Sequence, residues 1–205
     1  MHYSMTYESD IGKIYLVSDE THLVGLWLEG QKYFMGNLKE RPLENEKLPV
    51  LEAAKVWLDD YFAGKRPAIS ELPLKPQGSE FRQIVWEILC EIPYGETTTY
   101  GKIAKEAAKR LGRQSMTAQA VGGAVGHNPI SIIIPCHRVL GSDGSLTGYA
   151  GGIDKKIGLL RHEGYYSSTN TSLSIPQIGH TQSSGRSSKA VPGSIPLSGS
   201  PIAGS

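Results

Sequence analysis

Cysteine is scarce in this 205-residue chain, which has only Cys90 and Cys136. Two cysteines cannot form the disulfide framework of a small secreted domain. The sequence also has no CxxC pair and no Cys/His cluster at zinc-finger spacing. It therefore predicts two free thiols, no bound metal and no cofactor.

Long apolar runs are missing as well. The longest are only a few residues, far short of the roughly 20 residues that a helix needs to cross a bilayer. Residues 1–4 have neither a basic region nor an apolar signal core. With 39% hydrophobic and 20% charged residues, the composition is typical of a globular protein without membrane contact. We expect it in the cytoplasm, or in the nucleus of a eukaryote.

The net charge of +1 hides a difference between two parts of the chain. Residues 1–80 hold 9 Lys and Arg against 13 Asp and Glu, whereas residues 81–166 hold 10 against 7. A basic bias in the second part fits a phosphate-contacting surface, although charged residues are usually just a solvated face.

The first part has the pattern of a small α/β domain. Apolar segments at 14–17 and 23–28 are separated by turn-forming residues at 18–21, which predicts an antiparallel hairpin. Residues 48–62 then carry apolar side chains at helical spacing. We predict one domain over residues 1–80, with a small antiparallel sheet and a helix.

A proline-containing segment at 67–78 predicts an extended linker to a second domain, residues 81–166. Ser79 can cap its first helix, which ends before the Pro-Tyr-Gly of residues 93–95. Residues 167–205 contain 12 Ser and no Phe, Tyr or Trp, so they cannot bury enough apolar surface to fold. We predict a disordered tail there.

The centre of the second domain has the outline of a helix-turn-helix. Thr98 or Thr99 can cap a helix, residues 111–114 can turn, and Ser115 can cap a second short helix over 117–125. Any αα-hairpin gives the same outline. The fold class that we predict is α+β, an α/β domain followed by a mainly helical domain.

The second of these helices is rich in small residues. Gly122 and Gly123 each cost roughly 1 kcal/mol against alanine inside a helix. Either tight helix packing or the close approach of a nucleic acid can compensate for this cost.

Cys136 is the strongest candidate for chemistry. It follows a short apolar run, 132–134, that Pro135 ends, so its backbone direction is fixed. A free thiol is only a few per cent thiolate at neutral pH and needs a base or a positive field to act as a nucleophile. His137 and Arg138 follow directly. The alternative is a buried structural cysteine.

The sequence from Ile134 to Leu140, Ile-Pro-Cys-His-Arg-Val-Leu, resembles the active-site signature of the O6-alkylguanine-DNA alkyltransferases. Further blocks resemble this family in the same order and spacing, at residues 92–101, 120–129, 148–152 and 159–164. The resemblance extends from about Phe81 to Gly164. Residues 1–80 resemble the family's first domain only in size and outline.

The resemblance implies a DNA repair protein that transfers the alkyl group of O6-alkylguanine, and of O4-alkylthymine, to its own cysteine once. It implies that Cys136 is the nucleophile and that His137 relays its proton through a water and is oriented by Glu163. Tyr100 is implied to donate a hydrogen bond to the leaving guanine. Asn128 is implied to be a hinge that ties the helix-turn-helix to the active-site strand.

The implied partner is double-stranded DNA, from which the damaged nucleotide is rotated out while the second helix enters the minor groove. The residues implied to contact DNA are Thr117, Ala118, Gln119, Ala120, Gly122 and Arg138. The implied base pocket is formed by Val139, Tyr149 and Gly151. A monomer is expected, because reading one base requires no two-fold symmetry.

One position departs from the family pattern. At Gln119 the better-known members carry an arginine that fills the gap left by the rotated base. Glutamine is shorter and uncharged, so we expect hydrogen bonding in place of charge, with somewhat weaker DNA affinity.

Three alternatives are open. A lesion-binding protein without transfer is opposed by the presence of Cys136. A hydrolase using Cys136, His137 and Glu163 would turn over repeatedly. A transcription regulator would carry an added DNA-binding or zinc module, which the sequence does not show. Cys90 is interpreted as a structural thiol.

Overall fold

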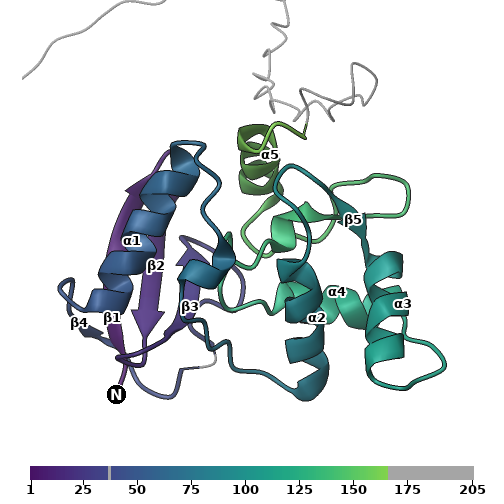
Figure 1. Ribbon diagram of the computed structural model, residues 1–205, viewed down its shortest axis with the longest axis horizontal. Coiled ribbons are helices and arrows are strands. Elements are labelled where there is room, and N and C mark those ends of the chain that lie inside the picture. Colours follow the sequence, from purple (N-terminus) through teal and green to yellow (C-terminus); the bar gives the residue numbers. More distant parts are fainter. Residues whose placement is uncertain (37, 166–205) are drawn as a thin grey trace, which may run out of the picture. The chain divides into compact units, whose positions relative to one another are not determined.

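A computed structural model describes residues 1–36 and 38–165 (Figure 1). Three antiparallel strands dominate the sheet, β1 (Tyr3–Ser9), β2 (Gly12–Ser18) and β3 (Leu23–Leu28), and a two-residue strand β4 (Leu43–Glu44) pairs parallel to β1. The strand order is β3-β2-β1-β4. The predicted hairpin corresponds to β2 and β3 and is confirmed.

Helix α1 (Pro49–Phe62) packs against this sheet (Figure 1). Proline at its first turn fits a position whose N–H has no intrahelical partner. The face turned to the sheet buries Val50, Leu51, Ala54, Trp57, Leu58 and Tyr61. The helix was predicted from residue 48, which is its N-cap.

Strand β1 was not predicted, because its alternating side chains are only partly apolar. In the predicted linker, residues 69–71 form a short 3-10 helix, η1 (Ile69–Glu71). Leu74 also forms an isolated parallel bridge with Leu23 of β3. This segment is therefore tied to the sheet.

Helices α2 (Glu80–Cys90), α3 (Tyr100–Arg110) and α4 (Ala118–Gly126) pack against one another. Ser79 and Thr99 cap α2 and α3 as predicted, each through a side-chain oxygen that accepts a backbone N–H. The cap of α4 was predicted wrongly. Its N-cap is Thr117, whose hydroxyl accepts from the N–H of Ala120 at 3.1 Å, and not Ser115.

The chain then returns to the sheet side. Short strands β5 (Thr98–Thr99) and β6 (Val139–Leu140) pair in parallel, a 3-10 turn η2 (Cys136–Arg138) precedes β6, and helix α5 (Ile153–His162) follows. A single cluster of buried apolar residues draws members from the sheet, α1, α2, α3 and α4. The α+β fold class is thus confirmed.

The division near residue 80 remains a prediction, since the core continues across it. The predicted tail at 167–205 lies outside the described residues.

Candidate active site

The segment that carries Cys136 is fixed to strand β3. The N–H of Leu26 donates to the carbonyl of Pro129 at 2.8 Å, and the N–H of Ser131 donates to the carbonyl of Leu26 at 2.9 Å. Ile132 then adopts a left-handed backbone with φ of 68°. The apolar run predicted at 132–134 is buried, as expected, and the chain turns within it.

Asn128 closes this turn around the cysteine. Its Nδ2 donates to the carbonyl of Ile134 at 2.9 Å and to Sγ of Cys136 at 3.1 Å, and its Oδ1 accepts from the N–H of Ile130 at 3.0 Å. The predicted hinge position, directly after α4, thus has direct contact with the sulfur.

Cys136 is only 4% exposed. Burial raises the pKa of its thiol, and the hydrogen bond from Asn128 and the charge of Lys156 reduce that rise. The thiol is therefore protonated at neutral pH in this state, so a nucleophilic role requires a base.

His137 and Glu163 form a fully enclosed pair. Nε2 of His137 lies 2.7 Å from Oε1 of Glu163, and both side chains are inaccessible to solvent. Burial lowers the pKa of His137, although Glu163 acts in the opposite direction. The lowered pKa favours a neutral imidazole. Since a carboxylate only accepts, Nε2 carries the proton and Nδ1 is left as an acceptor. Among the described residues, Nδ1 has no hydrogen-bond partner.

Glu163 also binds Arg138, one of the residues predicted to contact DNA. Nε and Nη2 of Arg138 donate to the two carboxylate oxygens at 2.8 and 3.0 Å, and Nη1 donates to the carbonyl of Ile92 at 2.6 Å. The guanidinium is buried and all three of its nitrogens are engaged within the protein, so its contact with DNA stays a prediction that this arrangement does not support. Arg138 instead neutralises the carboxylate that holds His137.

Two further donors complete the surroundings of Glu163. The hydroxyl of Tyr61 in α1 donates to Oε1 at 2.8 Å, and the N–H of Gly95 donates to Oε2 at 3.2 Å. Burial alone would raise the pKa of Glu163, but His137 and Arg138 outweigh it and hold that pKa well below its usual range. Glu163 is therefore a fixed anion.

Sequence reasoning missed Lys156, a fully buried lysine on α5. Its Nζ donates to the carbonyls of Val139 at 2.6 Å and Thr147 at 3.2 Å. Burial lowers its pKa to about 8, so it is still charged at neutral pH, and that charge favours a thiolate at Cys136. Nothing in the sequence distinguished it from the adjacent Lys155, which is only half-buried.

Tyrosines line the other side of the cysteine. The hydroxyl of Tyr100 donates to the carbonyl of Thr147 at 3.1 Å. Burial raises the pKa of Tyr100 to about 12, and negative charge at Cys136 adds to that rise. Tyr149 is also buried, and burial raises its pKa well above 10. A Cβ at Gly151 would lie 2.7 Å from the ring of Tyr149, so only glycine fits there without displacement.

Of the predicted pocket residues, Val139 lies in β6 and is fully buried. The structure therefore brings together the predicted catalytic residues Cys136, His137, Glu163, Tyr100 and Asn128 with the predicted pocket residues Tyr149, Val139 and Gly151. The predicted DNA-contacting residues other than Arg138 lie on another surface.

That surface is the first turn of α4. Thr117, Ala118, Gln119 and Ala120 are exposed, and Gly122 is half-buried. A Cβ at Gly122 would only touch the ring of Tyr100 at 3.9 Å, and one at Gly123 would meet nothing within 4 Å. Internal packing therefore does not require these two glycines, and the close approach of a nucleic acid stays a prediction.

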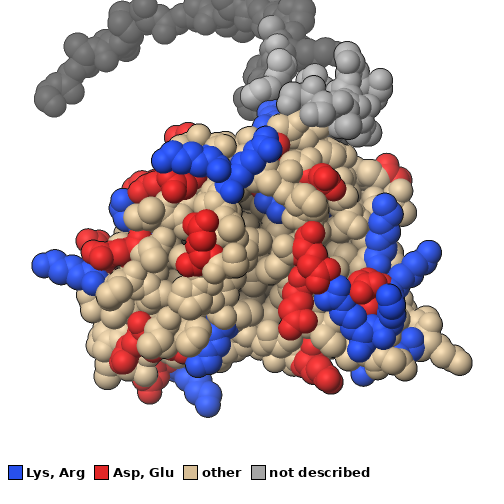
Figure 2. Space-filling model, in the orientation of Figure 1, with Lys and Arg blue, Asp and Glu red and all other residues tan. Residues whose placement is uncertain are grey.

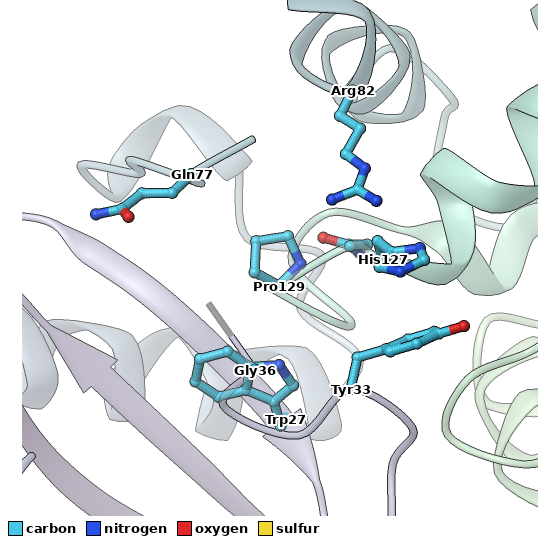
Figure 3. Close-up of a pocket in the computed structure, with 8 residues that line it drawn as sticks. Trp27, Tyr33, Gly36, Gln77, Arg82, His127 and Pro129 are labelled. Carbon is cyan, nitrogen blue, oxygen red and sulfur yellow. The ribbon is translucent and has the colours of Figure 1, made fainter. Parts of the chain in front are cut away.

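A hollow of about 260 Å³ lies beside Asn128 (Figure 3). The Arg82 side chain extends toward His127, whose ring stacks on Tyr33 with centroids 3.9 Å apart. Neither Cys136 nor Tyr149 lines this hollow. It is therefore distinct from the predicted base pocket.

Among the described residues, no group of three or more His, Cys, Asp or Glu side chains could hold a metal ion. None of the helices in the described part is long and apolar enough to span a membrane.

The described residues thus form an α/β unit and a helix-turn-helix, and contacts from both surround a buried cysteine that is supported by a histidine–glutamate pair. This arrangement defines a class of two-part proteins with a cysteine site beside a candidate DNA-binding helix. Family models identify both parts. Residues 1–76 match the 6-O-methylguanine DNA methyltransferase ribonuclease-like domain, and residues 80–165 match the DNA-binding domain of the same family. The chain belongs to the 6-O-methylguanine DNA methyltransferase family.

Individual relatives agree with this assignment. A methylated-DNA–protein-cysteine methyltransferase of Haemophilus influenzae is 40% identical over 161 residues, 78% of this chain and 86% of that protein. One of Methanosarcina barkeri is 48% identical over 157 residues, 76% of this chain and 93% of that protein. The crystal structure of Mycobacterium tuberculosis OGT in complex with DNA is 38% identical, with a TM-score of 0.68, and covers 78% of this chain and 92% of its own.

Proposed function

We propose that this protein repairs DNA by transferring the alkyl group of O6-alkylguanine, and also of O4-alkylthymine, to Cys136, each molecule acting once. The observation that carries this proposal is the contact between Asn128 and the buried sulfur of Cys136, next to a neutral His137 bound to Glu163. The names of the relatives support the same activity.

The proton moves first in this mechanism. Nδ1 of His137 accepts the thiol proton of Cys136 through a water, and the resulting imidazolium is stabilised by the anionic Glu163. The charge of Lys156 favours the thiolate. Burial keeps competing solvent away from the sulfur.

Transfer then follows as a single displacement. The sulfur forms a bond to the alkyl carbon while the bond from that carbon to O6 breaks, and the electron pair remains on the base. Tyr100, whose hydroxyl donates to the carbonyl of Thr147 in the absence of DNA, turns this donor to the base as negative charge develops. The product at Cys136 is a thioether, which has no acidic or electrophilic group that His137 could act on, so the protein is spent.

In this mechanism, α4 is the helix that contacts DNA. A base stacked in a duplex cannot reach a sulfur that is 4% exposed, so the damaged nucleotide must leave the helix. We propose that the exposed turn of Thr117, Ala118, Gln119 and Ala120 enters the minor groove, where Gly122 allows close approach. Tyr149, Val139 and Gly151 then wall the base pocket.

The proposal is tested by intact-protein mass after incubation with excess duplex containing O6-methylguanine. The expected result is a gain of one methyl group per molecule, which peptide mapping places on Cys136 and not on Cys90. Continued release of demethylated duplex beyond one equivalent would instead indicate a hydrolase. Binding without any gain in mass would indicate a lesion-binding protein.

Replacing Gln119 with arginine is expected to tighten binding to alkylated duplex by roughly tenfold, because a charged and longer side chain adds phosphate attraction to gap filling. Fluorescence anisotropy at fixed salt measures the change. Gln114→Arg, in the exposed turn before α4, is the matched control for added charge. Equal gains in both variants would contradict a specific role for position 119.

We further propose a monomer that acts in the cytoplasm and is divided at residue 80 into a supporting domain and a DNA-binding, alkyl-transferring domain. A monomer is supported because the proposed target is a single base, which requires no two-fold symmetry in the protein. The boundaries of the two family matches support the division.

A further inference from the structure

Three lysines form a stripe on helix α3, the first helix of the helix-turn-helix. Lys102, Lys105 and Lys109 are spaced by three and four residues and are all exposed. The face of α3 opposite to them buries Ile103, Ala104, Ala107 and Ala108. The stripe therefore points directly away from the core.

The charges of this lysine stripe are not neutralised within the protein. Across the described residues, none of the three ammonium groups has an ion-pair or hydrogen-bond partner. The nearby carboxylates of Glu91 and Glu106 both bind Arg110 instead, at 2.7 and 2.9 Å. Figure 2 shows Lys and Arg side chains gathered over α3.

Lysines around α1 behave differently. Lys55 lies 3.1 Å from Asp59, and Lys65 lies 2.7 Å from Asp60. The three lysines of the stripe therefore differ from Lys55 and Lys65, whose charges are neutralised by neighbouring carboxylates. Such an uncompensated stripe attracts an extended anion.

We infer that the lysine stripe binds the phosphate backbone of the DNA duplex, flanking the site that α4 occupies. This inference rests on the proposed function. Helix α3 packs on α4, and the ring of Tyr100, at the start of α3, is the nearest neighbour of Gly122. A duplex held by α4 therefore passes close to α3.

The spacing of the stripe fits a nucleic acid strand. At a rise of 1.5 Å per residue, the seven steps from Lys102 to Lys109 cover about 10.5 Å. Three nucleotide steps of one strand, which join four phosphates, cover about 10 Å along the duplex axis. Each lysine can thus meet one phosphate, and this attraction compensates for the missing charge at Gln119.

The test is the salt dependence of duplex binding. The variant K102Q/K105Q/K109Q is compared with wild type by anisotropy of a labelled, unmodified 20-bp duplex over a range of KCl concentrations. Each lost phosphate contact reduces the slope of log K against log salt by about 0.9, so the expected reduction is about 2.7, with affinity roughly ten- to a hundredfold lower near 0.1 M salt.

The matched control is K47Q/K55Q/K65Q, which removes the same charge around α1. Its slope is expected to stay within about half a unit of wild type, since distant exposed charges are screened. Equal slopes for wild type and the α3 variant, or equal losses in both variants, would overturn the inference. If the α3 variant lost affinity only for single-stranded RNA, that result would overturn the assignment to duplex DNA.

A single-turnover transfer experiment distinguishes a failure of this inference from a failure of the proposed function. At saturating protein, the α3 variant is expected to methylate itself at the wild-type rate, because the stripe contacts no reacting group. A wild-type protein that binds duplex with the expected slope but never gains a methyl group would contradict the proposed function alone.

Discussion

Replacing Cys136 with serine is expected to abolish alkyl transfer while lesion binding is retained. A serine hydroxyl is far less acidic than a thiol and a much weaker nucleophile, so the buried His137 cannot activate it sufficiently. Loss of an essential nucleophile lowers a rate by roughly 10⁴-fold or more. The hydroxyl can still accept the hydrogen bond from Asn128, so the fold is expected to remain.

Intact-protein mass and duplex binding measure the two halves of this expectation. Cys90→Ser is the control, because burial raises the pKa of Cys90 to about 11 and makes it a poor nucleophile. That variant is expected to gain one methyl group like the wild type. A methyl gain in Cys136→Ser would show that another group accepts the alkyl.

Replacing Glu163 with glutamine is expected to reduce both stability and transfer. The amide leaves the buried guanidinium of Arg138 without a counter-charge, and breaking a buried ion pair from one side costs about 3–5 kcal/mol of unfolding free energy. It also removes the anion that fixes the tautomer of His137. Loss of a general base's orientation reduces transfer by roughly 10²- to 10⁴-fold.

Urea unfolding and single-turnover transfer measure these two effects. Glu96→Gln, an exposed carboxylate in the same part of the chain, is expected to change neither. If Glu163→Gln does not fold, Tyr61→Phe removes only one of the hydrogen bonds to Glu163 and is expected to cost about 0.5–1.5 kcal/mol. A destabilisation below about 1 kcal/mol by Glu163→Gln would contradict a buried ion pair.

Acid gives a second measure of Glu163. Its pKa in the folded protein is lowered, so its contribution to stability is complete above the pKa of an unfolded glutamate and is lost as pH falls toward the folded value. The unfolding free energy of the wild type is therefore expected to fall more steeply below about pH 4 than that of Glu163→Gln. Parallel curves would contradict the role of the carboxylate.

Local rules were sufficient for much of the helical part. Ser79 and Thr99 cap their helices because a side-chain oxygen near a free N–H is a short-range interaction that the sequence displays directly. The same rule misplaced the cap of α4, because Ser115 and Thr117 are both suitable and packing selects Thr117. The short apolar run before Pro135 was equally ambiguous, since buried turns and buried strands share this composition.

Long-range contacts explain the other differences. The resemblance implied that Arg138 contacts DNA, and its ion pair with Glu163, 25 positions further along the chain, could not be predicted from the sequence. The buried ammonium group of Lys156 donates hydrogen bonds to two carbonyls, and neither is adjacent to it in sequence. The spacing of residues along the chain does not predict either contact.

The two hydrogen bonds between Leu26 and the segment before Cys136 have a kinetic consequence, together with the bond from Tyr61 to Glu163. The nucleophile and its supporting anion cannot separate from the first 80 residues by a small local fluctuation. Their amides are therefore expected to exchange with solvent deuterium only through opening of both halves at once. The temperature at which repair fails would then coincide with the midpoint of a single cooperative transition, with no inactive but folded intermediate below it.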